Sequence, residues 1–163
     1  MTTNKQEINA IIYRARVARL ATADSKAIPH IVPVVFAFDG EKYYIPVDEK
    51  TKTAKPDKLR RIKNIEINPA VALLIDEYSE DWKKLLFIMI QGKASILGKR
   101  RGNAKEEEEE QQENDENDKL LKIAHKLLFT KYTQYQHIAI GELCIVIYPQ
   151  KTIFWSMVSK ESK

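Results

Sequence analysis

Two stretches of the chain have no polar side, and they limit the folds that it can adopt. Residues 71–75 read Val-Ala-Leu-Leu-Ile, and residues 86–90 read Leu-Phe-Ile-Met-Ile. A strand with no polar side is expected to be buried on both faces. The chain has 163 residues, which is the length of one domain. In so short a chain, these strands predict a closed or nearly closed barrel whose outer wall is covered by helices or by another subunit.

The remaining pattern places short strands in sequence, with helices at three points. Strands are predicted over residues 19–22, 28–38 and 43–47 as an antiparallel meander, with a tight turn at Asp39-Gly40. Helices are predicted over residues 4–16, in the basic stretch ending at Asn68-Pro69, and along the stripe Leu120, Ala124, Leu127 and Leu128. Gly92 predicts a bulge, and Pro149-Gln150 predicts the turn of a final hairpin made by residues 138–148 and 152–158. The fold class is therefore mainly β (α+β), an antiparallel barrel with accessory helices in a single domain of residues 1–163.

The net charge of +4 hides an uneven distribution. Residues 103–118 hold nine acids and one base, so this segment is an acidic, low-complexity insert. The rest of the chain has 26 bases against 14 acids. A basic body predicts an anionic partner, which is a phosphorylated small molecule, a nucleic acid or an anionic surface.

The densest positive charge lies just before and within the second predicted helix. Residues 50–63 contain seven bases and one acid, Asp57. The dipole of a helix disfavours cations at its start, and a bound anion would relieve that cost. Exposed amides together with Lys and Arg side chains therefore indicate a phosphate site. The alternative, which charge alone leaves open, is a solvated basic helix face that binds nothing.

Several classes of protein lack support in the sequence. The single cysteine, Cys144, excludes an internal disulfide, and the three histidines do not have metal-ligand spacing, so no metal site is expected. The glycine motifs of P-loop and dinucleotide-binding proteins are absent, as is GxSxG. No apolar run is long enough to span a bilayer, and a cytoplasmic location is expected.

A series of segments resembles one family of flavoproteins. The series comprises Arg19-Leu-Ala-Thr-Ala-Asp24, Pro29-His-Ile-Val-Pro-Val34, Phe38-Asp-Gly40, Tyr44-Ile-Pro-Val-Asp-Glu-Lys50, Leu59-Arg-Arg-Ile-Lys-Asn-Ile65, Asn68-Pro-Ala-Val-Ala-Leu73, Asp76-Glu-Tyr-Ser-Glu-Asp-Trp82, Gln91-Gly92 and Phe154-Trp-Ser156. In this order they resemble the pyridoxamine 5′-phosphate oxidase-like, FMN-binding split-barrel family, and most closely its F420-dependent branch. The resemblance covers most of the chain apart from the acidic insert. It implies a homodimeric split barrel with FMN or F420 in a groove at the subunit interface.

The resemblance also implies which residues bind the cofactor. The phosphate contact of the family falls on Arg61, with Lys50, Lys52 and Lys58 nearby. The implied neighbours of the ring system are Val32, Pro33, Val34, Gln91 and Trp155, and the implied path of the ribityl chain and phosphate is Pro46, Val47 and Asp48. The Ser or Thr that the family carries after the third strand is replaced here by Val47-Asp48, so its contact is expected at Thr51 or Thr53. The Arg/His pattern with which true pyridoxamine phosphate oxidases hold substrate is absent from residues 152–163, so that reaction is not expected.

Three functions remain open from the sequence. The leading one is an oxidoreductase that uses FMN or F420 to transfer hydride to or from a small molecule. Because the cofactor carries that chemistry, no catalytic residue of the protein is required. The second is a non-catalytic cofactor carrier or sensor of the same fold. The third is a barrel that binds single-stranded nucleic acid, with Tyr43, Tyr44 and Trp82 as stacking platforms.

Overall fold

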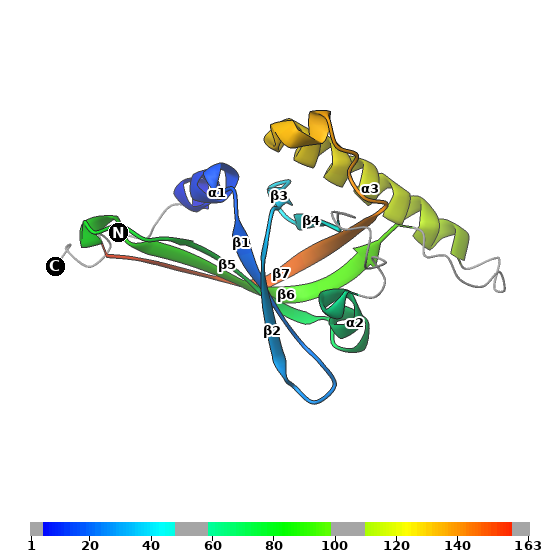
Figure 1. Ribbon diagram of the computed structural model, residues 1–163, viewed down its shortest axis with the longest axis horizontal. Coiled ribbons are helices and arrows are strands. Elements are labelled where there is room, and N and C mark those ends of the chain that lie inside the picture. The colour runs from blue at the N-terminus through cyan, green and yellow to red at the C-terminus, as the bar shows by residue number, and fades with distance from the viewer. Residues whose placement is uncertain (1–4, 48–58, 99–109, 158–163) are drawn as a thin grey trace.

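One curled antiparallel sheet forms the centre of the molecule, with helices packed against both of its faces (Figure 1). The computed structural model describes residues 5–47, 59–98 and 110–157. In these ranges the strands are β1 (Ala18–Ala23), β2 (Pro29–Val34), β3 (Ala37–Phe38), β4 (Tyr43–Val47), β5 (Ala70–Glu77), β6 (Leu86–Leu97) and β7 (Leu143–Ser156). The helices are α1 (Lys5–Arg14), α2 (Arg60–Ile67) and α3 (Glu110–Lys131), with single 3₁₀ turns η2 (Trp82–Lys84) and η3 (Thr133–Gln136).

The strand order is β2-β1-β5-β6-β7-β4-β3, and every pair is antiparallel. β6 and β7 are the longest strands and carry the middle of the sheet. The predicted fold class, an antiparallel split β-barrel of mainly β (α+β) character with accessory helices, is confirmed. The acidic insert is helical where the structure describes it, since α3 begins at Glu110.

The inner face of the sheet holds the main core. Alternate residues of each strand point inward, among them Leu20, Leu73, Ile88 and Ile145, and all four are inaccessible to solvent. α1 adds Ile11 and Ile12 to this core, while α2 adds Ile62 and Ile65. These two helices cover the inner side because their apolar residues recur at helical spacing.

The outer face is divided into a covered half and an open half. α3 covers the half made by β4, the first part of β7 and the end of β6, where its Leu120 and Ala124 pack on Tyr44, Cys144 and Val146. The other half comprises the outward residues of β2, β1, β5, the first part of β6 and the last part of β7. None of its outward apolar residues belongs to a core cluster of the described residues.

Of the two predicted covers for residues 71–75 and 86–90, helices of the described chain are absent from their outer side, and another subunit stays a prediction. Ala72 and Leu74 of β5 and Phe87 and Met89 of β6 point outward and are only half-buried, whereas Val71, Leu73, Ile75, Ile88 and Ile90 between and beside them are buried. These outward residues are apolar, yet no helix or strand among the described residues covers them.

The predicted meander is also wrong, because residues 28–38 form two strands. β2 ends at Val34, and β3 lies at the opposite end of the strand order, where it pairs with β4. At the break, the Tyr132 hydroxyl accepts a hydrogen bond from the Phe36 N–H at 3.0 Å and lies 2.9 Å from the Phe36 carbonyl oxygen. Both backbone groups of Phe36 are thus engaged by a side chain instead of a neighbouring strand.

The predicted C-terminal hairpin is likewise wrong, since β7 runs without a turn from Leu143 to Ser156. Pro149 lies opposite Gly92, and the register with β6 shifts between Gln91 and Gly92, which confirms the predicted bulge. A Cβ at Gly92 would overlap the carbonyl oxygen of Tyr148 and lie 3.1 Å from the Pro149 Cα. The proline therefore marks a bend against a glycine of the neighbouring strand, where a missing N–H is tolerated.

Candidate functional site

The open half of the outer face, which we call the open face, has a composition that follows from strand register. Its first row across the sheet is Pro33, Arg19, Leu74, Met89 and Ile153, and its second row is Ile31, Ala21, Ala72, Gln91 and Lys151. Ala21 and Ala72 lie between larger residues, so the centre of the second row is low. The two rows are thus mostly apolar, with Arg19, Gln91 and Lys151 as their polar members.

Charged and aromatic groups border the open face at one end. The Arg19 guanidinium contacts the Asp76 carboxylate at 2.6 Å, with both side chains partly exposed. Next to Asp76 in the sheet, the Phe87 and Trp155 rings stack with centroids 5.7 Å apart and planes inclined by 17°. The ion pair is open to solvent and contributes little to stability by itself. It does leave a charged pair beside an aromatic surface.

α2 brings a second feature, a helix start that carries positive charge and no acid of its own. Arg60 and Arg61 occupy the first turn, which has no acidic residue, and Leu59 at the N-cap makes no side-chain hydrogen bond to the helix. The amides of such a first turn are oriented to bind an anion. Arg61 is half-buried, while Arg60 is exposed and lies 3.5 Å from the Asp24 carboxylate.

The β1–β2 hairpin places Asp24 near this helix start. The Oδ1 of Asp24 accepts hydrogen bonds from the N–H groups of Lys26 and Ile28, each at 2.9 Å. The Ile28 bond is the main cause that lowers the pKa of Asp24. Ala27 closes the turn with a φ of 60°, a left-handed conformation that disfavours a Cβ.

The structure brings together some of the predicted site residues and separates others. Pro33, Gln91 and Trp155 share the open face, but Val32 and Val34 of the same β2 segment point to the inner face. Val47 is fully buried in the core, and Pro46 is buried opposite Cys144, which packs on α3. The positions of Asp48, Lys50, Thr51, Lys52 and Lys58, as well as that of Thr53, lie outside the described residues.

Four residues of the open face were missed at the sequence level, namely Arg19, Asp76, Leu74 and Phe87. The alternation of side chains along a strand could have identified Phe87. It lies four positions before Gln91, so the two side chains point to the same face of the strand. Placing Arg19 beside Leu74 required the pairing of β1 with β5, which sequence patterns do not specify.

The aromatic pair proposed as a stacking platform is not accessible. Tyr43 is 2% exposed and Tyr44 is 0% exposed. Burial raises the pKa of both hydroxyls, and the Tyr44 hydroxyl donates to the Asp39 carboxylate at 2.7 Å. The third aromatic, Trp82, is 63% exposed and lies at the β5–β6 connection. The nucleic-acid alternative therefore loses two of its three stacking residues.

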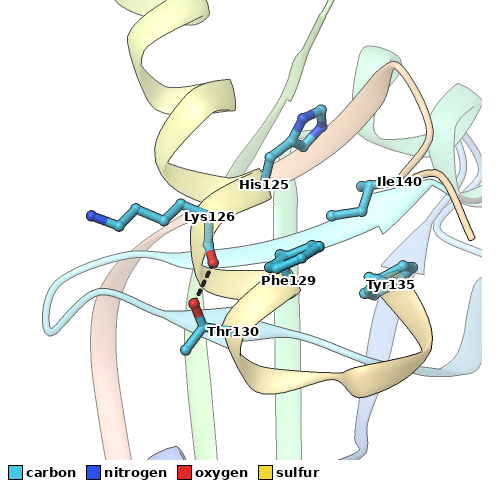
Figure 2. Close-up of a pocket in the computed structure, with 6 residues that line it drawn as sticks. All are labelled: His125, Lys126, Phe129, Thr130, Tyr135 and Ile140. Carbon is cyan, nitrogen blue, oxygen red and sulfur yellow. Dashed lines mark hydrogen bonds between the residues drawn. The ribbon is translucent and has the colours of Figure 1, made fainter. Parts of the chain in front are cut away.

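A depression of about 360 Å³ lies between the last turns of α3 and the segment that carries Tyr135 and Ile140 (Figure 2). It is lined by His125, Lys126, Phe129, Thr130, Tyr135 and Ile140. The Lys126 side chain extends away from the aromatic rings, and the Thr130 hydroxyl donates to the Lys126 carbonyl at 2.8 Å. The Nε2 of His125 is buried. The wall of the depression is mainly apolar, and its Thr130 hydroxyl is already bonded within α3.

A buried lysine lies where α3 meets the β2–β3 break. The Lys131 ammonium lies 4.0 Å from the centroid of the Phe36 ring, and its Nζ is buried with no hydrogen-bond partner. Burial, with a smaller effect from the Arg16 charge, lowers the pKa of Lys131 to about 8. The Arg16 guanidinium lies over the Tyr132 ring at 4.5 Å. This cluster holds α3 against the segment that follows α1.

Neither a metal centre nor a membrane-spanning helix is found among the described residues. No group of three His, Cys, Asp or Glu side chains in this part of the chain is placed to hold a metal ion. Among the helices that the structure describes, none is long and apolar enough to cross a membrane.

Comparison with known proteins gives the family. No protein of curated function matches the sequence. Among solved structures, a conserved hypothetical protein from Mycobacterium tuberculosis is 19% identical with a TM-score of 0.63, over 96% of this chain and 86% of that one. An FAD-binding protein from Mesorhizobium loti is 16% identical with a TM-score of 0.56, over 93% and 91% of the two chains. The heme storage protein HutZ from Vibrio cholerae is 15% identical with a TM-score of 0.51, over 93% and 92%.

The similarity to these solved structures supports the fold, and a match to a family sequence model supports the family. Residues 5–131 match the sequence model of the family described as pyridoxamine 5′-phosphate oxidase. This match covers α1, the strands from β1 to β6, α2 with Arg61, and α3, but not β7. The chain therefore belongs to the pyridoxamine 5′-phosphate oxidase family.

Proposed function

We propose that the chain is a homodimeric oxidoreductase that binds FMN or F420 and transfers hydride to or from a small molecule. The observation that carries the proposal is the open face, an apolar surface of a family member that no described helix covers. Met89, Leu74 and Phe87 are half-buried there, and Ile31 is 63% exposed. Contiguous apolar surfaces of this kind mark interaction sites.

A second copy of the chain is the partner that best fits the open face. The face is mostly apolar and carries the Arg19–Asp76 pair at one end. Largely apolar surfaces are typical of homodimer interfaces. In a twofold arrangement the same surface meets itself, so each copy would cover the other.

The residues present fit a phosphorylated flavin or deazaflavin. Arg61 and the first turn of α2 suit a phosphate, since this turn contains no acid of its own. The low centre formed by Ala21 and Ala72 and the stacked Phe87–Trp155 pair suit a planar ring system. Gln91 in the same row supplies an amide that can donate and accept hydrogen bonds.

Bound FMN or F420 would supply the hydride chemistry. The residues of this chain would bind the phosphate, orient the ring and exclude water between the two subunits. The surplus of positive charge outside the acidic insert favours F420, whose tail carries additional acidic groups. The basic residues expected along that tail, Lys99, Arg100 and Arg101, lie outside the described residues.

Other ligands and roles are outcomes of the same experiment. A carrier or sensor would bind the cofactor without turnover. Haem is less well supported on the open face, because none of the three histidines lies there: His30 points inward, and His125 and His137 lie on α3 and after η3. Single-stranded nucleic acid keeps only Trp82 as an exposed member of its proposed stacking set. The buried free thiol of Cys144 is compatible with the predicted cytoplasmic location.

The test is a spectroscopic titration of the purified protein with FMN and, separately, with F420. We expect saturable binding of one of them by a dimer. Haemin and a single-stranded oligonucleotide serve as competing ligands, the latter at two salt concentrations because phosphate-backbone binding weakens steeply with salt. Tight binding of the oligonucleotide with no uptake of either cofactor would contradict the proposal.

A further inference from the structure

A buried polar contact between Asn64 and Thr22 joins α2 to the sheet. Thr22 of β1 and Asn64 of α2 are the two polar residues that are buried in the described part of the chain, each 3% exposed. The Nδ2 of Asn64 donates to the Oγ1 of Thr22 at 3.0 Å. Ile62 and Ile65 of the same helix add apolar contacts with the core.

This contact connects the two parts of the proposed cofactor site. Asn64 lies three residues after Arg61, so the two residues share one side of α2. Thr22 pairs with His30 of β2, the strand that also carries Pro33 of the open face. The bond therefore links the helix with the phosphate-binding arginine to the hairpin at the edge of the ring-binding surface.

Apolar packing alone would leave the rotation of α2 poorly fixed. Hydrophobic burial is non-directional, and two isoleucines can pack on the core over a range of helix rotations. A hydrogen bond requires a defined distance and angle. Buried polar groups cost desolvation and are not needed for stability, so their value can lie in specifying one arrangement.

We propose that the Thr22–Asn64 hydrogen bond is a positioning contact that fixes the rotation of α2, and with it the place of Arg61 relative to the open face. Neither residue touches the cofactor in this account. The proposal rests on the proposed function for its binding consequence, whereas its structural consequence holds without any ligand.

Paired substitutions separate positioning from stability. Thr22→Val or Asn64→Leu alone leaves one polar group buried without a partner and should lower the unfolding midpoint. The double variant replaces both groups with apolar ones of similar size, so most of the midpoint should return. The double variant still lacks the hydrogen bond between residues 22 and 64. In the double variant we expect the amides of residues 60–67 to exchange with deuterium about tenfold faster relative to those of β6, a change that corresponds to about 1.4 kcal/mol.

The same double variant should bind FMN or F420 about tenfold more weakly than the wild type, despite its recovered midpoint. Leu128→Ala is the matched control, since it shortens a buried side chain in a core cluster that shares no buried residue with the cluster of Ile62 and Ile65, and it should lower stability without changing exchange in residues 60–67. Wild-type exchange and affinity in the double variant would overturn the inference. If the wild type binds neither cofactor, the proposed function fails, and the exchange measurement alone still decides whether Thr22 and Asn64 fix α2.

Discussion

Replacing the buried lysine of α3 should change how stability depends on pH. Lys131→Met removes an ammonium group that is buried without a hydrogen-bond partner and keeps most of the volume of the side chain. The pKa of Lys131 falls from an ordinary value of 10.5 to about 8 in the folded protein. Between these two values, the unfolded chain holds a proton on this residue that the folded chain has released.

The sign follows from proton linkage. The unfolded state binds more protons in this window. The free energy of unfolding of the wild type therefore increases as the pH rises from about 8 toward 10.5, because Lys131 loses its buried charge. Below pH 8 the cost of the buried charge is present in full. The whole shift corresponds to about 3 kcal/mol. Partial exposure of the side chain and the Phe36 ring at 4.0 Å, which favours the charged form, reduce the expected effect to about 1–2 kcal/mol.

The assay is urea unfolding of both proteins at several pH values from 7.5 to about 9.5, below the range where unfolded tyrosines titrate. We compare the difference between variant and wild type at each pH, so that contributions from other titrating groups cancel. The stability of Lys131→Met relative to the wild type should fall as the pH rises through this range. Lys126→Met, which changes an exposed lysine on the same helix, should show a constant difference. A constant difference for Lys131→Met as well would refute the reasoning.

Three further substitutions test separate parts of the structure. Arg61→Ala should weaken FMN or F420 binding by about 1.5–3 kcal/mol with little change in unfolding. Binding is measured by titration, with Lys63→Ala, at an exposed neighbouring position, as the control. An unchanged dissociation constant would show that Arg61 is not part of the site. Gly92→Ala should destabilise the fold by about 1–3 kcal/mol in urea unfolding, because its Cβ meets the backbone of Tyr148; a change within about 0.5 kcal/mol would show that the β6–β7 bulge can relax. Ala27→Gly should stabilise it by about 0.5–1 kcal/mol by relieving a left-handed residue, and the same assay would contradict this if stability fell.

The class of the fold could be predicted from the sequence because it depends on local patterns. Apolar strands and helical stripes with few interruptions indicated an antiparallel barrel, and Gly92 indicated a bulge. The errors concern partners far apart in the chain. Pro149 was interpreted as a turn because no local signal shows that Gly92 lies opposite it on β6. The break at Phe36 depends on a hydroxyl 96 residues away, on Tyr132.

The candidate site was predicted in part for the same reason. Pro33, Gln91 and Trp155 were expected to neighbour one ligand, and the structure places them on one face through the registers of β2, β6 and β7. Val32 and Val34 were assigned with Pro33 as one segment, although alternation along a strand sends them to the other face. Arg19 and Asp76 were missed because their contact depends on the pairing of β1 with β5.

The most direct test of the central claim is a sedimentation velocity experiment on Leu74→Asp in the presence of FMN, or of F420 if the wild type selects it. Leu74 is half-buried at the centre of the open face and contributes to no core cluster of the described residues, so the variant should fold. We predict a folded monomer that sediments without the cofactor, while Ile123→Asp, on the exposed side of α3, stays a dimer that carries it. A Leu74→Asp protein that remains a dimer and retains the cofactor would contradict the assignment of the open face to both roles.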